Sequence, residues 1–184
     1  VTPRLYGVSY LRKPALFYWL VAGSFKFLGF NEFAARAVPA IFGFLSVLAA
    51  YFFVRKVLGS KSAFFSAILL ASNFWFIQVG RYLLIDAVFT FFLVGALYFF
   101  YLGSEEESFP ENYFFIFFAC LALAFLTKGL AALAVTAAAA FSYLGLTGRL
   151  QKVFFRIPWF RGAALFLVLT LPWFVAISRR EPHF

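Results

Sequence analysis

Residues 112–148 read NYFFIFFACLALAFLTKGLAALAVTAAAAFSYLGLTG, and Lys128 is the only charged residue among them. A helix needs about 20 predominantly apolar residues to cross a bilayer. The stretch is long enough for two such helices, and Gly129 permits a tight turn directly after Lys128. This pattern predicts two membrane-spanning helices joined at Lys128 and Gly129.

Charge-free stretches also occur elsewhere, at residues 37–54, 62–80, 87–103 and 162–178. The chain is 65% hydrophobic and 12% charged, whereas soluble proteins contain about 25% charged residues. This composition excludes a soluble domain. We predict an all-α fold, a polytopic transmembrane helical bundle with about six spans, since a span needs about 20 residues. The expected spans lie near residues 33–54, 62–80, 84–103, 112–127, 129–147 and 162–178.

The segment before the first span has a different character. Residues 14–30 are apolar and aromatic but contain Lys26. Aromatic rings and long cationic side chains favour the headgroup region, so we expect an interfacial helix rather than a spanning one. In this interpretation the chain is part of one transmembrane domain, with an outer loop and interfacial helix at 1–31 and transmembrane helices over 32–184.

The two ends of the sequence are polar. The chain begins Val1-Thr2-Pro3, contains no methionine, and ends with a segment that includes Arg180 and His183. From these ends we expect a piece of a longer protein, truncated at both ends.

The net charge of +9 comes largely from cations between the predicted spans. Such cations favour anionic membrane lipids as partners rather than nucleic acid. Seven cations fall on one side of the predicted spans, and the other side has nine if the N-terminal segment lies there, so the positive-inside rule leaves the orientation open. On the second side, which includes Asp86, the cations stand singly beside helix ends, as a phosphate-binding site requires. We interpret that side as extracytoplasmic.

Asp86 is the only acidic residue between Glu32 and Glu105. A carboxylate at membrane depth is costly and often has a function, so Asp86 is our candidate for a general base or an orienter of a cation; a structural ion pair is the alternative. Tyr82 precedes it by four residues, which predicts a shared helix face and a hydrogen bond. Arg81 precedes it by five, so Arg81 reaches another partner or belongs to a preceding turn.

Two lysines are candidate phosphate ligands. Pro14 suits the first position of a helix, so Lys13 is expected beside a helix N-terminus, where anions bind. Lys128, at its turn, is a candidate for a second phosphate contact. An anchor at the membrane surface is the alternative for each lysine. Glu32 and Arg36 are spaced for a structural ion pair between residues four apart.

The sequence has little that predicts metal or nucleotide chemistry. His183 is the only histidine and Cys120 the only cysteine, so we expect no metal site within this chain. Phosphate-binding and dinucleotide glycine motifs are absent, and we expect no cofactor within this part of the protein.

Several motifs in order resemble one family. They are Pro3-Arg4-Leu5, Tyr10-Leu11-Arg12-Lys13-Pro14, Glu32-Phe33-Ala34-Ala35-Arg36, Gly80-Arg81 through Asp86, Phe125-Leu126-Thr127-Lys128-Gly129 and Leu171-Pro172-Trp173. The chain resembles the polyprenyl-phosphate-dependent membrane glycosyltransferases, which include protein O-mannosyltransferases and lipid A aminoarabinose transferases. The ending Arg180-Glu181-Pro182-His183-Phe184 is most similar to the aminoarabinose branch.

The resemblance implies a GT-C fold in the inner or plasma membrane, with an active site on the extracytoplasmic face. It implies transfer of a sugar from a polyprenyl-phosphate carrier to an acceptor such as lipid A or a protein hydroxyl. Lys13 matches the lysine that binds the carrier phosphate, Tyr10 matches a tyrosine of the same loop and is a candidate for the substrate site, and Asp86 matches a second functional aspartate. Arg81, Tyr82 and Lys128 would complete the substrate site.

Two departures from the family pattern limit the expected activity. The principal catalytic aspartate of the family precedes the segment at Pro3, so we expect these 184 residues alone to be inactive. Arg12 stands where the aminoarabinose branch has glutamate, which leaves a divalent metal in the whole protein open. Rival functions are a transporter or flippase of an anionic lipid or solute, and a non-catalytic membrane scaffold.

Overall fold

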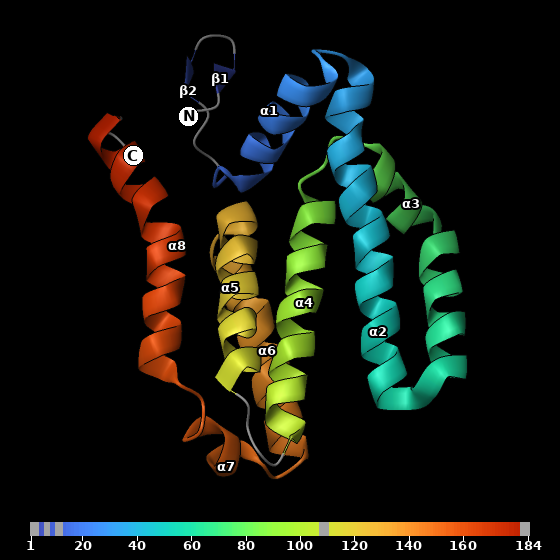
Figure 1. The fold of residues 1–184 in the computed structure, drawn as a ribbon, viewed down its shortest axis with the longest axis vertical. Helices are drawn as coiled ribbons and strands as arrows, with labels where there is room; N and C mark the ends of the chain where they lie inside the picture. The colour runs from blue at the N-terminus through green and yellow to red at the C-terminus, as the bar shows by residue number, and fades with distance from the viewer. Residues whose placement is uncertain (1–3, 6–7, 10–12, 107–110, 181–184) are drawn as a thin grey trace. The chain divides into compact units, whose positions relative to one another are not determined.

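The computed structural model describes residues 4–5, 8–9, 13–106 and 111–180. A short antiparallel hairpin, β1 (Arg4–Leu5) and β2 (Val8–Ser9), precedes an otherwise helical chain. The described helices are α1 (Leu16–Leu28), α2 (Glu32–Ser72), α3 (Phe74–Arg81), α4 (Asp86–Glu105), α5 (Glu111–Lys128), α6 (Leu130–Leu146), α7 (Leu150–Phe154) and α8 (Trp159–Arg180) (Figure 1). The chain forms two compact units, residues 16–94 and the remainder, and each is described by itself.

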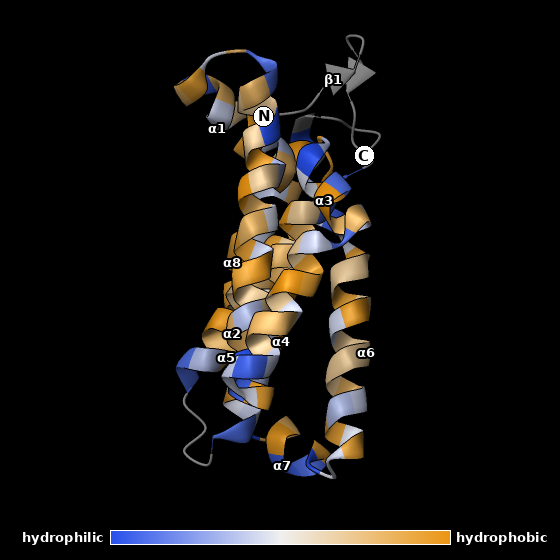
Figure 2. Ribbon diagram, turned by 90° about the vertical axis from the view of Figure 1, so that its right-hand side faces the viewer, coloured by the Kyte–Doolittle hydropathy of each residue, from blue (hydrophilic) through white to orange (hydrophobic). Residues whose placement is uncertain are grey.

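The long helices have the length and composition of membrane spans. Within the described residues, four helices are long and apolar enough to cross a bilayer, namely α2, α4, α5 and α8, while α1 and α6 are shorter apolar helices. Hydrophobic residues occupy most of each long helix, and hydrophilic residues gather near helix ends (Figure 2). The predicted all-α transmembrane fold is therefore confirmed.

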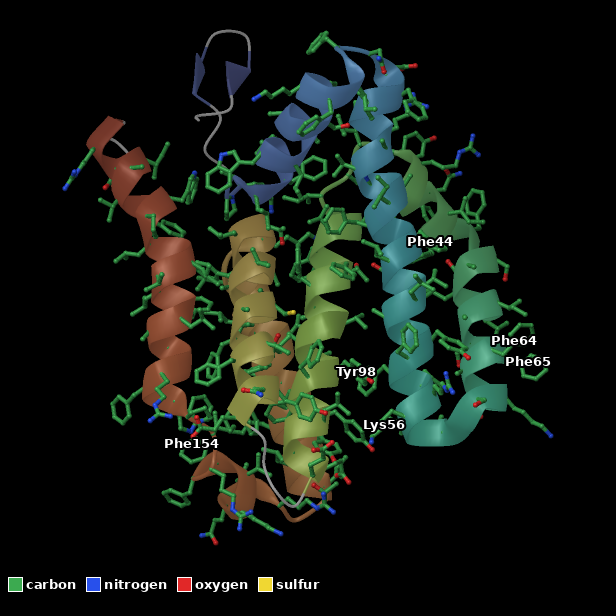
Figure 3. All side chains as sticks on the ribbon, in the orientation of Figure 1. Phe44, Lys56, Phe64, Phe65, Tyr98 and Phe154 are labelled. Atoms are coloured by element: carbon green, nitrogen blue, oxygen red, sulfur yellow. The ribbon has the colours of Figure 1, made fainter. Side chains whose placement is uncertain are left out.

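Helix α2 contains the reversal that the two predicted spans at 33–54 and 62–80 require, but without the loop expected between them. The backbone at Gly59 has φ 85° and ψ 174°, a conformation that glycine adopts without a steric penalty. The chain turns back on itself there (Figure 1), so Arg55 and Lys56 are helical rather than in the expected loop. On the second limb, Phe64 and Phe65 project away from the first limb and are 58% and 64% exposed (Figure 3).

The second predicted span, residues 62–80, is interrupted. Asn73 ends α2 with an extended backbone (φ −68°, ψ 122°) and begins α3, where its side chain accepts a hydrogen bond from the Phe76 amide at 3.0 Å. Asparagine is a preferred N-cap because its side-chain oxygen satisfies an amide that the helix leaves unpaired. The prediction of one continuous span was wrong because this local bond competes with helix continuation.

Helix α1 packs against α2 through a small apolar core. Phe17 and Val21 of α1 are buried with Val38 of α2 and Val88 of α4. The Ser24 hydroxyl donates to the Ala34 carbonyl at 2.6 Å, which ties the two helices together. With 13 residues, α1 is too short to span a bilayer.

The other unit is organised around α5, which packs against α6 and α8. Glycines permit close approach at two points: a Cβ at Gly103 would lie 2.9 Å from the Phe114 ring, and one at Gly162 would overlap the Phe118 ring. At the far end of α4, the Glu105 carboxylate accepts hydrogen bonds from the Tyr143 hydroxyl and the Arg149 guanidinium. These bonds join α4 to α6 and to the segment that leads into α7.

Candidate functional site

A pocket in the unit formed by residues 16–94 brings two arginines together. Phe33, Arg36, Ala37 and Ala40 of α2 and Gly80 and Arg81 of α3 line this pocket, which has a volume of about 240 Å³. We call it the arginine pocket. A Cβ at Gly43 would lie 3.6 Å from the Gly80 Cα, so two glycines allow the backbones of α2 and α3 to approach closely. This approach places Arg81 beside the first turns of α2.

The charges at the arginine pocket are only partly neutralised within it. The Arg36 guanidinium donates to the Glu32 carboxylate at 3.1 Å, which confirms the predicted pair. Both side chains are more than half exposed, at 55% for Arg36 and 85% for Glu32. An exposed pair of this kind contributes about 0–1 kcal/mol, so Arg36 can turn toward an anion with little loss. Sequence reasoning assigned Arg36 mostly to structure and missed that it lines a pocket with Arg81.

Asp86 lies at the start of α4, in the first helical turn, and is partly buried. Negative charge is favourable there because unpaired amides and the helix dipole give the N-terminus partial positive character. The predicted helix face shared by Tyr82 and Asp86 is wrong. Tyr82 caps the C-terminus of α3 with an extended backbone (φ −84°, ψ 154°), outside α4. For Arg81 we expected either another partner or a place in a preceding turn. It is the last residue of the preceding helix, α3, in agreement with the second alternative.

Lys128 is the last residue of α5, and the predicted turn after it is confirmed. Gly129 has φ 62° and ψ −134°, and its amide donates to the Phe125 carbonyl at 2.7 Å. Thr127 is fully buried, with its hydroxyl bonded to the Ala124 carbonyl at 2.5 Å. A buried threonine and a positive-φ glycine therefore hold the partly exposed Lys128 at the helix end.

Lys13 is exposed and precedes α1, which begins at Leu16. We had expected Pro14 at the first position of the helix, but it stands two residues before α1. Tyr10, Arg12 and His183 lie outside the described residues. Lys13 and Lys128 belong to one compact unit, and Arg81, Tyr82 and Asp86 belong to the other, so the convergence of all five on one site stays a prediction.

Comparison with known sequences gives one family and several relatives. The sequence model described as dolichyl-phosphate-mannose-protein mannosyltransferase matches residues 12–175. An uncharacterised protein of Aquifex aeolicus is 34% identical over 95% of this chain and 34% of its own length. An undecaprenyl phosphate-α-4-amino-4-deoxy-L-arabinose arabinosyl transferase of Edwardsiella ictaluri is 28% identical over 100% of this chain and 34% of its own length.

Solved structures show the same likeness. The crystal structure of ArnT from Cupriavidus metallidurans bound to undecaprenyl phosphate matches with a TM-score of 0.90 and 26% identity. That match covers 100% of this chain and 34% of ArnT, so the chain spans about a third of the length of the relatives that it matches. The fold is therefore the GT-C fold of ArnT. Because the family model covers most of the sequence, the chain belongs to the dolichyl-phosphate-mannose-protein mannosyltransferase family.

Proposed function

We propose that the protein that carries this chain is a membrane glycosyltransferase that moves a sugar from a polyprenyl-phosphate carrier to an extracytoplasmic acceptor such as lipid A or a protein. The observation that carries this proposal is the likeness, over the whole chain, to ArnT bound to undecaprenyl phosphate, with a TM-score of 0.90. The amphipathic donor and the membrane-spanning helices of this chain share one environment, which is consistent with a lipid-linked substrate.

The candidate residues have complementary roles in such a reaction. Asp86 would orient a cation, or it would accept a proton from the acceptor, and proton transfer of this kind typically accelerates a reaction about 10²–10⁴-fold. Lys13, Tyr10 and Lys128 would contact the carrier phosphate, whose negative charge increases as the sugar leaves. Fixed cations at that position stabilise the transition state more than the ground state.

The arginine pocket supports the same chemistry. Arg81 and Tyr82 stand where α3 ends, and Arg36 adds a second guanidinium from α2. Guanidinium groups bind phosphate with two parallel hydrogen bonds, which fixes its orientation as well as its position. In this proposal the pocket holds a phosphate of the donor or of a lipid acceptor at the extracytoplasmic side of the inner or plasma membrane.

The proposal is tested with the full-length protein in vesicles that contain lipid A as the acceptor and a polyprenyl-phosphate donor with the radiolabel in its sugar. We expect release of polyprenyl phosphate and label on the acceptor, and loss of both in Asp86→Asn. The matched control is Glu111→Gln, which removes the first-turn acid of another helix, α5. Movement of the intact donor across the bilayer without cleavage would support a flippase instead and contradict the proposal.

A further inference from the structure

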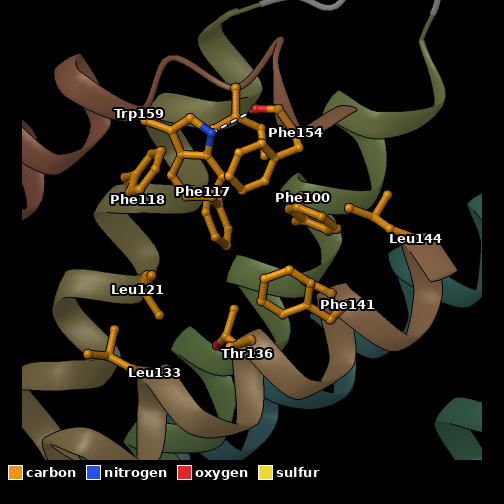
Figure 4. Close-up of a pocket in the computed structure, with 13 residues that line it drawn as sticks. Phe100, Phe117, Phe118, Leu121, Leu133, Thr136, Phe141, Leu144, Phe154 and Trp159 are labelled. Atoms are coloured by element: carbon orange, nitrogen blue, oxygen red, sulfur yellow. Dashed lines mark hydrogen bonds between the residues drawn. The ribbon is translucent and has the colours of Figure 1, made fainter. Parts of the chain in front are cut away.

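A second cavity lies in the other unit, and none of the residues assigned above lines it. It has a volume of about 290 Å³, and side chains from α4, α5, α6 and the segment from α7 to the start of α8 line it. Figure 4 shows Phe100, Phe117, Leu133, Phe141 and Trp159 around this space. The Trp159 indole nitrogen is already engaged, because it donates to the Phe154 carbonyl at 2.7 Å. We call this cavity the phenylalanine pocket.

The lining of the phenylalanine pocket fits a hydrocarbon chain. Every lining residue except Thr136 has an apolar or aromatic side chain. The Thr136 hydroxyl is buried, and it has no hydrogen-bond partner among the described residues. By contrast, the hydroxyl of Thr170 in α8 bonds to the Phe166 carbonyl at 2.8 Å. The pocket's volume of about 290 Å³ lies at the lower end of the range of cavities that hold small molecules, about 300–1,000 Å³, so the pocket has room for a segment of a hydrocarbon chain.

The wall of the phenylalanine pocket at the α7 end carries positive charge on its outer side. Val153 and Ile157 are buried at 0% and 5% exposure, whereas the neighbouring Lys152 and Arg156 are exposed. Phe155 and Phe160 are 81% and 94% exposed. A short segment with buried aliphatic residues, outward cations and exposed aromatic rings is typical of the membrane interface. Basic pockets between transmembrane helices bind anionic lipid headgroups.

We propose that the phenylalanine pocket holds one acyl chain of an anionic phospholipid, whose headgroup lies against Lys152 and Arg156. This site is independent of the proposed sugar transfer, since it shares no residue with Asp86, the lysine candidates or the arginine pocket. It gives the basic segment 149–161 a ligand.

Native mass spectrometry of the full-length protein tests the chain-binding part. The protein is released from vesicles of equal phosphatidylglycerol and phosphatidylcholine, and the retained lipid is counted. We expect Ala140→Phe, which places a ring in the pocket, to reduce retained phosphatidylglycerol several-fold. Ala138→Phe makes the same change on α6 outside the pocket lining and should retain the wild-type amount. Equal retention by both variants would overturn the proposal.

The headgroup and the polarity of the ligand have separate tests. Lys152→Gln/Arg156→Gln should remove the preference for phosphatidylglycerol over phosphatidylcholine, whereas Lys56→Gln/Lys61→Gln, with the same charge change, should keep it. Thr136→Val removes the buried hydroxyl at almost constant volume and should leave retention unchanged or higher. Loss of binding in Thr136→Val would show a hydrogen-bonded ligand rather than a hydrocarbon chain.

Photo-crosslinking of the wild-type protein tests the proposal without any substitution that could impair folding. Phosphatidylglycerol with a diazirine in its acyl chain is added to the vesicles, and the crosslinked peptides are identified after illumination. We expect labels on α6 between Leu133 and Leu144 and on the peptide that contains Phe154. Labels confined to other helices would mean that another part of the protein fills the cavity, and the proposal would be wrong.

Discussion

Arg36 and Arg81, which are far apart in the sequence and belong to different helices, line the same pocket. Two like charges at one place repel each other unless an anion lies between them. Glu32 neutralises Arg36 only through an exposed contact. The presence of two arginines in the lining of one pocket is therefore the feature of this unit that most directly supports phosphate binding.

Arg81→Gln in the full-length protein should raise the KM for the lipid-linked donor or acceptor about tenfold or more, because a hydrogen bond to a charged group contributes about 1.5–3 kcal/mol. Arg36→Gln should act in the same direction. Steady-state kinetics in vesicles measure the effect, and Arg55→Gln, on the same helix but outside the pocket, is the control. Unchanged KM values for both would exclude the arginine pocket from substrate binding.

Asp86→Asn should lower the rate of sugar transfer at least about 100-fold, since general acid–base groups contribute about 10²–10⁴-fold. Its effect on stability should be small, because a charge at a helix N-terminus contributes about 0.3–1 kcal/mol. Single-turnover assays and thermal unfolding in detergent separate the two quantities. A variant that unfolds much earlier than wild type would indicate a structural role for this carboxylate instead.

Gly162→Ala should lower the free energy of unfolding by about 1–3 kcal/mol, because overpacking a tight interface forces neighbouring groups to move. The added Cβ would overlap the Phe118 ring on α5. Gly145→Ala is the matched control, since nothing lies within 4 Å of a Cβ at that position. Its free energy of unfolding should change only by the difference in helix propensity between glycine and alanine, about 1 kcal/mol or less. Chemical unfolding in mixed micelles compares the pair, and equal stabilities would contradict the described packing of α8 on α5.

Glu105→Gln should destabilise the unit more than Tyr143→Phe does, because Glu105 accepts from both Tyr143 and Arg149. Loss of the Tyr143 hydroxyl removes one hydrogen bond, worth about 0.5–1.5 kcal/mol. Glu111→Gln breaks the Arg161 pair, whose side chains are 70% and 53% exposed, and should change stability by less than about 1 kcal/mol. Thermal shifts of the three variants should follow that order.

Helix content and the turn at Gly129 could be predicted because both depend on local sequence. Long apolar runs need internal hydrogen bonds in a bilayer, and helices provide them. The Glu32–Arg36 pair follows from the helical repeat in the same way. Asn73 was missed although it is a residue that favours helix starts, because hydrophobicity averaged over a window conceals a single capping side chain.

The sequence by itself determined that this protein lies in a membrane, that it is helical, and which charged residues interrupt its apolar runs. Those properties are sums over neighbouring residues. Only the tertiary structure decided that the helix continues through Arg55 and Lys56 as far as Gly59, that Gly43 and Gly80 let Arg36 and Arg81 line one pocket, and that an apolar cavity lies beside the basic α7. These depend on one backbone conformation or on the close approach of distant helices, and the pattern of hydrophobic residues along the chain contains neither.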